Sequence, residues 1–227
     1  MTERVGIVTG ASRGLGLALV GALSERGWRL LVDARNGDEL ERAVGRLPGV
    51  VPLAGDVADA GHRAALAAAA GDRIDLLVNN ASTLGPIPRP SLAEYPVDAL
   101  AEVYAVNLVA PLALVQLALP RLADGAAVVN VTSDAAREPY EGWGGYGSAK
   151  AALDQLTAIL AAEHPALRVY AFDPGDMRTV LHQQAFPGED ISDRPPPEES
   201  VPALLELIEG RLPSGRYTAA ELAAALA

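Results

Sequence analysis

Short apolar runs alternate along the chain with longer stretches in which apolar residues recur at helical spacing. The short runs are rich in valine, leucine and isoleucine, as expected for strands that are buried on both faces of a sheet. Strands are predicted over residues 5–8, 28–32, 50–54, 74–78, 126–131, 167–172 and 215–217. Helices are predicted over residues 17–26, 38–47, 59–70, 97–122, 146–163, 201–209 and 219–226.

This order of strands and helices predicts an α/β fold. Strand, helix and strand, repeated along a chain, form a Rossmann-like, doubly wound parallel sheet, here of about seven strands, with helices on both faces. Ligands of such sheets lie outside the carboxyl ends of the strands. Pro111 lies inside the longest predicted helix and can kink it.

Three stretches carry residues typical of loops. Residues 83–96 hold four prolines and one glycine, so an irregular loop is expected there. A second loop is expected over residues 134–145, which are rich in glycine and aromatic residues. Residues 178–200 hold Pro187, the run Pro195-Pro196-Pro197 and several acids. Two interpretations of this last stretch stay open, a mobile segment that covers a substrate site and a solvated excursion at the surface.

Length and charge narrow the possible partners. A chain of 227 residues can bury one substantial core, so a single domain over residues 1–227 is expected. The formal net charge of −11, with only 18 basic residues, disfavours nucleic acid and anionic membranes as partners, so a nucleotide would have to be held by local groups. The chain has no cysteine and only three histidines, so no metal site is expected.

Targeting signals are not apparent in the pattern. The first residues enter a strand directly, without a charged and apolar leader. No apolar run is expected to approach the roughly 18 residues that cross a bilayer. We therefore expect a cytoplasmic protein.

A glycine-rich turn follows the first strand. Gly10, Gly14 and Gly16 stand between the apolar run and the first helical pattern. Gly10 allows a sharp reversal, whereas Gly14 and Gly16 remove side chains that would keep a pyrophosphate from the backbone and the helix from the strand. The helix that begins there directs unpaired N–H groups toward a bound anion. Strand, turn and helix together predict a nucleotide site.

Residues after the second strand bear on which dinucleotide would bind. In this fold the second strand delivers a residue to the adenosine ribose. An acid there hydrogen-bonds a 2′-hydroxyl, whereas an arginine accepts a 2′-phosphate. Asp33 and Arg35 both stand at this place, so these residues alone leave NAD(H) and NADP(H) open.

A tyrosine and a lysine form the candidate catalytic pair. Tyr146 and Lys150 are four residues apart in a predicted helix, so they share one face. A tyrosine with its ordinary pKa near 10 is a poor acid or base at neutral pH; a nearby cation lowers that pKa, whereas burial raises it. Lys150 is therefore expected to be needed. Ser133 ends the fifth strand, where its hydroxyl can bond the oxygen of a substrate carbonyl.

Together these segments resemble the short-chain dehydrogenase/reductase family over nearly the whole chain. The stretch Thr9-Gly10-Ala11-Ser12-Arg13-Gly14-Leu15-Gly16 is similar to the family's cofactor turn, Asp56-Val57 to its adenine contact and Asn79-Asn80-Ala81 to its fourth-strand motif. Pro174-Gly175 with Thr179 is similar to its nicotinamide-side motif. Asn107, Ser133, Tyr146 and Lys150 fall where the family carries its catalytic tetrad.

The resemblance implies an NAD(P)(H)-dependent oxidoreductase that interconverts a carbonyl and an alcohol by hydride transfer. It implies that Tyr146 exchanges the proton, that Ser133 orients the reacting oxygen, and that Lys150 lowers the tyrosine pKa and binds the nicotinamide ribose. It further implies that Asn107 holds a water in the proton relay. The implied cofactor-binding residues are Gly10, Ser12, Arg13, Gly14, Leu15, Gly16, Asp33, Arg35, Asp56, Val57, Asn80, Ala81, Tyr146, Lys150, Pro174, Gly175 and Thr179.

The same resemblance bears on the choice of cofactor. The family's NAD-type acid would fall at Ala34 in this chain, whereas Arg13 and Arg35 match positions that the family uses for a 2′-phosphate. NADP(H) is therefore favoured. Asp33, one residue before Ala34, can turn toward the ribose and keeps NAD(H) open.

A homodimer or homotetramer is also implied, joined through the long helices near Asn107 and Tyr146, with a small carbonyl or alcohol as substrate. Two departures from the family pattern, Ser82 for a glycine and Asp173 for an asparagine, change the polarity of the pocket and remove no catalytic group. Two other functions stay open, a nucleotide-binding sensor or scaffold without chemistry, and an epimerase or dehydratase on the same fold. The complete set of candidate catalytic residues favours the oxidoreductase over the binder.

Overall fold

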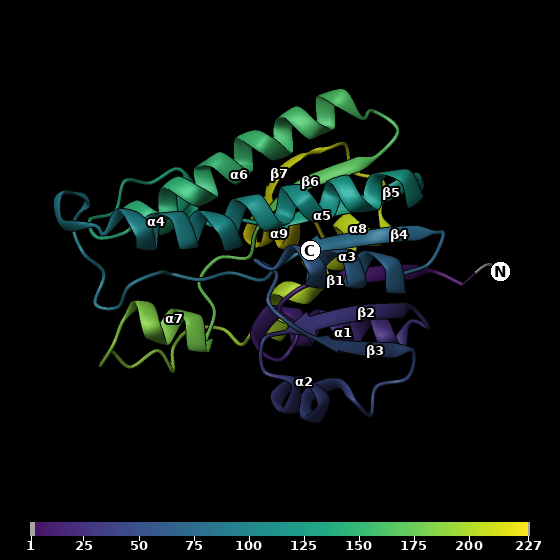
Figure 1. Cartoon of the computed structure of the whole chain (residues 1–227), viewed down its shortest axis with the longest axis horizontal. Helices are drawn as coiled ribbons and strands as arrows, with labels where there is room; N and C mark the ends of the chain where they lie inside the picture. Colours follow the sequence, from purple (N-terminus) through teal and green to yellow (C-terminus); the bar gives the residue numbers. More distant parts are fainter. Residues whose placement is uncertain (1–2, 227) are drawn as a thin grey trace.

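Seven parallel strands end along one edge of a twisted sheet (Figure 1). The structure is a computed structural model that describes residues 3–226 of the chain. The strand order is β3-β2-β1-β4-β5-β6-β7, which confirms the predicted fold class. The strands are β1 (Val5–Val8), β2 (Arg29–Ala34), β3 (Val50–Ala54), β4 (Ile74–Asn79), β5 (Leu122–Val131), β6 (Arg168–Asp173) and β7 (Gly215–Thr218).

Helices cover both faces of this sheet (Figure 1). One apolar cluster joins the sheet to α1, α2, α8 and α9, and a second joins it to α3, α5 and α6. Neighbouring strand residues point to opposite faces, so Val8 belongs to the first cluster and Ile7 to the second. The helices are α1 (Gly14–Glu25), α2 (Gly37–Val44), α3 (Ala60–Ala69), α4 (Val97–Tyr104), α5 (Ala110–Ala118), α6 (Gly144–Glu163), α7 (Val180–Ala185), α8 (Val201–Glu209) and α9 (Ala219–Leu226).

The strand order reverses between β1 and β4, which fixes where a ligand can bind. The chain builds β1, β2 and β3 outward in one direction and then returns to place β4 on the other side of β1. In the paired register Val8 lies between Val32 and Val78, so the segments that follow these three residues leave the sheet side by side. Loops that diverge at such a switch point leave a crevice at the carboxyl edge of the sheet.

The long helix predicted over residues 97–122 is divided in the structure. α4 continues into a π-helical segment, Ala105–Val109, which leads into α5 and a short 3₁₀ turn, Leu119–Arg121. Pro111 comes directly after the π-helical segment and has no N–H to donate, so regular helical bonding is interrupted at this place. β5 then begins at Leu122, four residues earlier than the predicted strand.

The same stretch is apolar enough to cross a membrane by length and composition alone. Within the described residues, Val97–Arg121 is the one helix that meets this test, so the prediction that no apolar run approaches that length was wrong. Helices in the cores of globular proteins meet the test as well. Leu114, Val115 and Ala118 of α5 are buried in the second apolar cluster, where they pack against the sheet.

The segment at residues 178–200 is more ordered in its local structure than the sequence indicated. It holds α7 and a 3₁₀ turn, Pro197–Ser200, and the Arg178 N–H donates to the Pro195 carbonyl at 2.8 Å, which ties the two ends of the segment together. Figure 1 shows α7 lying away from the sheet, beside the end where α4 and α6 begin. A role for this segment as a mobile cover stays a prediction.

Candidate active site

A cavity of about 1190 Å³ opens at the carboxyl edge of the sheet. It runs from the ends of β2 and β3, past the glycine turn, to the ends of β5 and β6 and the start of α7. Every residue predicted for catalysis or cofactor binding lines this cavity except Gly16 and Asn107. The structure therefore brings together residues that are up to about 170 positions apart in the sequence, from Gly10 to Thr179.

The glycine turn packs tightly against the end of β4. A Cβ atom on Gly10, whose φ is +70°, would lie 2.9 Å from the Cα of Ala81. A Cβ on Gly16 would overlap the Gly10 carbonyl and lie 2.6 Å from Nδ2 of Asn80. That Nδ2 donates to the carbonyls of Thr9 and Gly10 at 2.8 and 3.1 Å. Gly16 therefore packs against the turn from behind, which explains why it does not line the cavity, and Asn80 ties the turn to the end of β4.

The amino terminus of α1 is suited to hold a pyrophosphate. Arg13 precedes the helix in an extended conformation, and no side chain caps the helix. Its first N–H groups therefore remain available to an anion in the cavity. Across from Gly14, Cγ2 of Thr179 lies 3.5 Å from where a Cβ of that glycine would stand, so a larger residue would narrow the passage between α1 and the start of α7. This cradle fits the predicted dinucleotide.

Asp33 is committed to contacts within the protein. Its side chain is buried, and Oδ1 accepts the Gly10 N–H at 2.8 Å. Oδ2 lies 3.1 Å from Nε2 of His62 on α3. Because both carboxylate oxygens are engaged, the structure argues against the expectation that Asp33 can turn toward a ribose. β2 also runs two residues further than predicted, through Ala34, and this extension sets Asp33 inside the strand.

Arg35 lies at the end of β2 with an exposed side chain, on the cavity wall. Arg13 also lines this end of the cavity, with Nη1 3.8 Å from Oε1 of Glu39. On the other side, Asp56 accepts the Ala58 N–H at 2.8 Å and Val57 is buried, so these two residues form a fixed wall after β3. The arrangement provides two arginines and an apolar wall at the predicted adenosine end.

Tyr146 and Lys150 are buried on the inner face of α6, which begins at Gly144. Lys150 Nζ lies 5.5 Å from the centre of the Tyr146 ring and donates to the Val131 carbonyl at 2.7 Å. The hydroxyls of Ser133 and Ser82 lie near enough to the phenol to lower its pKa by hydrogen bonding. The Ser133 hydroxyl also donates to Oδ1 of Asp134 at 2.8 Å.

The pKa of Tyr146 departs from the sequence-based expectation. Burial raises the pKa of Tyr146 to about 12, and the hydroxyls of Ser133 and Ser82 oppose this only in part. Burial also lowers the pKa of Lys150 to about 8. The sequence predicted that Lys150 lowers the pKa of Tyr146. In the structure this pKa is raised instead, because removal of the phenol from water outweighs the hydrogen bonds from Ser133 and Ser82.

Asn107 lies in the π-helical segment and is fully buried. Its Nδ2 donates to the Thr83 carbonyl at 2.8 Å, and its Oδ1 accepts the Thr83 N–H at 2.9 Å and the Ser82 hydroxyl at 3.2 Å. The side chain therefore fixes the segment after β4 beside Tyr146. The water relay implied for Asn107 stays a prediction. In the structure its amide binds the Ser82 hydroxyl and the Thr83 backbone.

An apolar wall stands beside the candidate catalytic tyrosine. Leu84, Ala185 and Leu181 pack with Tyr146, and the Trp143 ring meets the Tyr146 ring edge-on at 5.6 Å. Except for Tyr146 itself, these residues come from the loop after β4, from the loop before α6 and from α7. The wall gives this end of the cavity an apolar surface within reach of the phenol.

Two polar residues that contact cavity-lining residues from behind were missed from the sequence. His62 pairs with Asp33, and Arg216 of β7 binds Asp173 and Asp154. His62 lies in the first turn of α3, the helix that follows β3. This position was the only feature of the sequence that could have indicated a contact with Asp33. Arg216 lies in a strand that was predicted, but its neighbour in the sheet could not be read from the sequence.

Comparison with known proteins identifies the family. The family model described as short chain dehydrogenase matches residues 4–190. The chain belongs to the short-chain dehydrogenase family. Sepiapterin reductase of Meriones unguiculatus is 37% identical over 199 residues, which cover 79% of this chain and 76% of that protein. Benzil reductase ((S)-benzoin forming) of Bacillus subtilis is 33% identical over 184 residues, 77% of this chain and 75% of that protein.

A solved structure agrees with this identification. A short chain dehydrogenase from Escherichia coli CFT073, complexed with NADPH, superposes with a TM-score of 0.86 at 28% identity and covers 96% of this chain and 97% of its own. The predicted family is confirmed, and the matches support an oxidoreductase with a nicotinamide dinucleotide cofactor. Within residues 3–226, no group of three or more acidic or histidine side chains is placed to hold a metal ion.

The pair of His62 and Asp33 makes the stability of this region depend on pH. The hydrogen bond with Asp33 raises the pKa of His62, although burial acts in the opposite direction. Because the folded pKa lies above the unfolded value near 6.5, the stabilisation is complete below that pH and is lost as the pH rises through the folded pKa. We expect His62→Gln to lower the free energy of unfolding more at pH 5.5 than at pH 9, measured by urea denaturation.

His164→Gln serves as the control, because no described carboxylate lies within ion-pair distance of His164. It should show no such difference between the two pH values. An equal loss for His62→Gln at both pH values would mean that the contact with Asp33 carries no charge.

Proposed function

We propose that this chain reduces the carbonyl group of a small molecule with NADP(H), and that Tyr146 donates the proton. The observation that carries the proposal is the burial of Tyr146 on the wall of the cavity, which raises its pKa to about 12. The phenol therefore keeps its proton at neutral pH and can give it to a carbonyl oxygen that gains negative charge. Reduction is the direction in which the neutral phenol acts as the acid.

The neighbouring side chains divide the remaining work. The hydroxyls of Ser133 and Ser82 lie beside the phenol and can stabilise negative charge on the substrate oxygen. Lys150, whose pKa is about 8, is mostly protonated at pH 7 and stabilises the phenolate that remains after Tyr146 has donated. A bound reduced nicotinamide supplies the hydride that the carbonyl carbon receives. The Val131 carbonyl fixes the ammonium in place for this role.

The apolar wall favours a carbonyl compound with an apolar or aromatic substituent. Leu84, Trp143 and Leu181 line the cavity beside Tyr146. Burying an apolar ring against them stabilises the bound substrate, whereas a strongly polar substituent would lose its hydration there. Two of the relatives are named as reductases of sepiapterin and of benzil, so these two compounds are suitable first probes.

Removal of the Tyr146 hydroxyl tests the proposed proton donor. We expect Tyr146→Phe to lower kcat/KM for benzil or sepiapterin by about 10²–10⁴-fold, because loss of a positioned acid has effects of that size. The measurement is NADPH oxidation followed by absorbance, with NADPH binding followed by fluorescence. Tyr104→Phe, on α4 and outside the cavity lining, should retain activity within about twofold. Full turnover by Tyr146→Phe would refute the assignment.

NADP(H) is proposed over NAD(H) because of the groups at the end of β2. Arg35 is exposed on the cavity wall and makes no ion pair with another described residue, so its guanidinium can bind a 2′-phosphate. Asp33, the competing acid, is occupied by Gly10 and His62. The solved relative with bound NADPH is consistent with this choice.

Arg35→Ala tests the choice of cofactor. We expect the KM for NADPH to rise about 10-fold to 100-fold, as for the loss of a hydrogen bond to a charged group, with the KM for NADH changed less than about twofold. Arg46→Ala, an exposed arginine outside the cavity, is the matched control and should change neither value. A parallel loss for both cofactors would show that Arg35 does not bind the 2′-phosphate.

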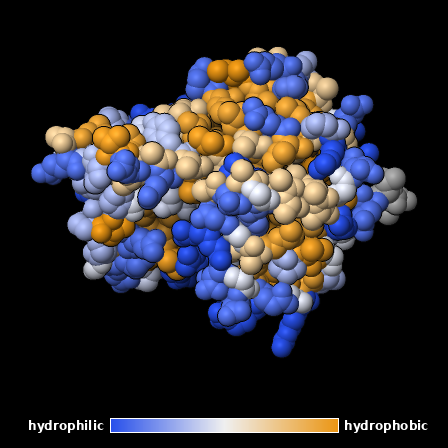
Figure 2. Space-filling model, in the orientation of Figure 1, coloured by the Kyte–Doolittle hydropathy of each residue, from blue (hydrophilic) through white to orange (hydrophobic). Residues whose placement is uncertain are grey.

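We also propose that the outer face of α5 and α6 joins two copies of the chain. Figure 2 shows apolar side chains gathered on this part of the surface. Val109, Leu117 and Ile159 are 50%, 38% and 48% exposed. Exposed apolar side chains that gather on one face are typical of contact surfaces between proteins.

A charge placed on this face tests the assembly. We expect Ile159→Glu to dissociate the oligomer, because each copy would bury an unpaired carboxylate in the contact. Light scattering coupled to size-exclusion chromatography gives the mass. Ala224→Glu, exposed on α9, should leave the mass of the wild-type oligomer unchanged. A wild-type monomer would rule out the proposed contact.

A further inference from the structure

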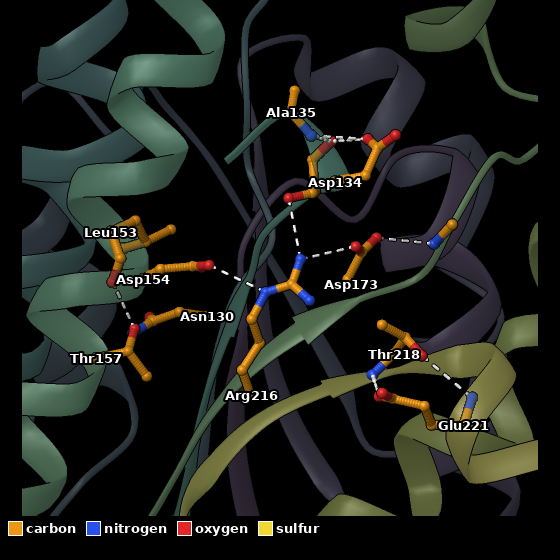
Figure 3. Close-up of polar contacts among 12 residues, drawn as sticks. Asn130, Asp134, Ala135, Leu153, Asp154, Thr157, Asp173, Arg216, Thr218 and Glu221 are labelled. Atoms are coloured by element: carbon orange, nitrogen blue, oxygen red, sulfur yellow. Dashed lines mark hydrogen bonds and ion pairs between the residues drawn. The ribbon is translucent and has the colours of Figure 1, made fainter. Parts of the chain in front are cut away.

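Arg216 of β7 joins three elements behind the active site (Figure 3). Its Nε donates to Oδ2 of Asp154 on α6 at 3.0 Å. Its Nη2 donates to Oδ2 of Asp173 at the end of β6 at 2.8 Å and to the Ser133 carbonyl after β5 at 3.2 Å. All three ion-pairing side chains are largely buried, with 15%, 17% and 8% of Arg216, Asp154 and Asp173 exposed.

The partners of Arg216 are connected to the residues that line the cavity. Asp173 uses its second oxygen to accept the Gly175 N–H at 3.0 Å, which fixes the turn that carries Pro174 and Gly175 (Figure 3). The bond to the Ser133 carbonyl fixes the backbone of the residue whose hydroxyl lies beside Tyr146. A single guanidinium therefore holds the ends of β5 and β6 in a fixed relation.

Arg216 also balances charge near the catalytic pair. Asp173 and Asp134 act to raise the pKa of Tyr146, and Asp154, one helical turn after Lys150, acts to raise that of Lys150. Arg216 is bonded to two of these three carboxylates.

Two other charges near Arg216 belong to the same environment. Glu221 of α9 has its pKa lowered mainly by hydrogen bonds from Thr218 and to a smaller extent by Arg216 and Arg137. Lys150 is a further cation, and it faces Tyr146 from the same helix. Without Arg216, the carboxylates at the site would outnumber the cations further.

The ion pairs of Arg216 are not optimal for stability alone. Asp154 Oδ1 is buried and has no hydrogen-bond partner among the described residues. A buried carboxylate with an unpaired oxygen costs free energy, and buried ion pairs are often no more stabilising than apolar residues of the same size. This arrangement favours a role in the geometry of the site.

We propose that Arg216 is a positioning residue of the active site, which sets the Ser133 backbone and the Pro174–Gly175 turn against the nicotinamide half of the cavity. The inference rests on the proposed use of NADP(H). It predicts that loss of Arg216 affects the nicotinamide half of the cofactor and spares the adenosine half, which binds at the glycine turn and β2 on the other side of the cavity.

Binding of two ligands distinguishes the contributions of the two halves without an assay of catalysis. NADPH occupies both, whereas 2′,5′-ADP carries only the adenosine half with its 2′-phosphate. We expect Arg216→Met to raise the Kd of NADPH at least about tenfold and to leave the Kd of 2′,5′-ADP within about twofold, measured by isothermal titration calorimetry below the unfolding temperature. Equal weakening of both ligands, or an unchanged Kd for NADPH, would overturn the proposal.

Arg168→Met is the matched control. Arg168 lies at the opposite end of the neighbouring strand β6, where it donates to the carbonyls of Gly125, Leu207, Ile208 and Gly210. Its loss should lower the melting temperature and leave both dissociation constants within about twofold. A purely structural role for Arg216 would make the two variants alike.

A second variant and a pH profile complete the test. Should Arg216→Met fail to fold, Arg216→Lys keeps one charge without the planar fork and should weaken NADPH selectively by a smaller factor. In Arg216→Met the less well opposed carboxylates should move the alkaline decline of kcat/KM for carbonyl reduction to higher pH than in the wild type and in Arg168→Met. An unmoved decline in Arg216→Met would contradict the charge balance assigned to Arg216. A wild-type protein that binds both ligands but reduces no carbonyl would contradict the proposed function and leave the test of Arg216 intact.

Discussion

The parallel arrangement of the strands is the constraint on which the rest of the structure depends. Because all seven strands run the same way, every strand delivers its following residues to one edge of the sheet. The carboxyl ends of the strands therefore bring to the cavity the glycine turn, Asp33, Asn80, Ser133 and Asp173. The helices that cover the two faces supply the apolar contacts that hold the strands in register, and α6 adds the phenol and the ammonium from the side.

Much of this could be predicted from the sequence because the pattern is repetitive. Each strand is a short apolar run, each helix follows at a regular interval, and the glycine turn has few alternative uses behind a buried strand. The division of the long helix was missed, since a π-helical segment leaves the apolar spacing almost unchanged and Pro111 indicates only that an irregularity exists. The contacts of Arg216 and His62 were missed for another reason. These contacts depend on which strands and helices are neighbours in space. The sequence of a predicted element does not indicate which residues its polar side chains will bind.

The candidate catalytic pair, Tyr146 and Lys150, shows where an argument from spacing alone predicts the wrong direction of a pKa shift. Spacing correctly placed Tyr146 and Lys150 on one face of a helix, but it contained no information on how deeply that face is buried. In the structure both groups lose most of their contact with water. Burial therefore raises the pKa of Tyr146 and lowers that of Lys150, which favours the neutral form of each. A buried phenol that keeps its proton can act as an acid, so the depth of the helix in the fold bears on the protonation state of the pair.

The contacts of Asp33 have a consequence for how coenzyme preference could evolve in this chain. An acid is already present at the end of the second strand, yet it serves as a strut between the glycine turn and α3. A chain that used an acid here to bind NAD(H) could not simply recruit this carboxylate, because doing so would break its contacts with the Gly10 N–H and with His62. It would have to acquire a new acid at Ala34, the next position of the strand, while leaving the strut untouched.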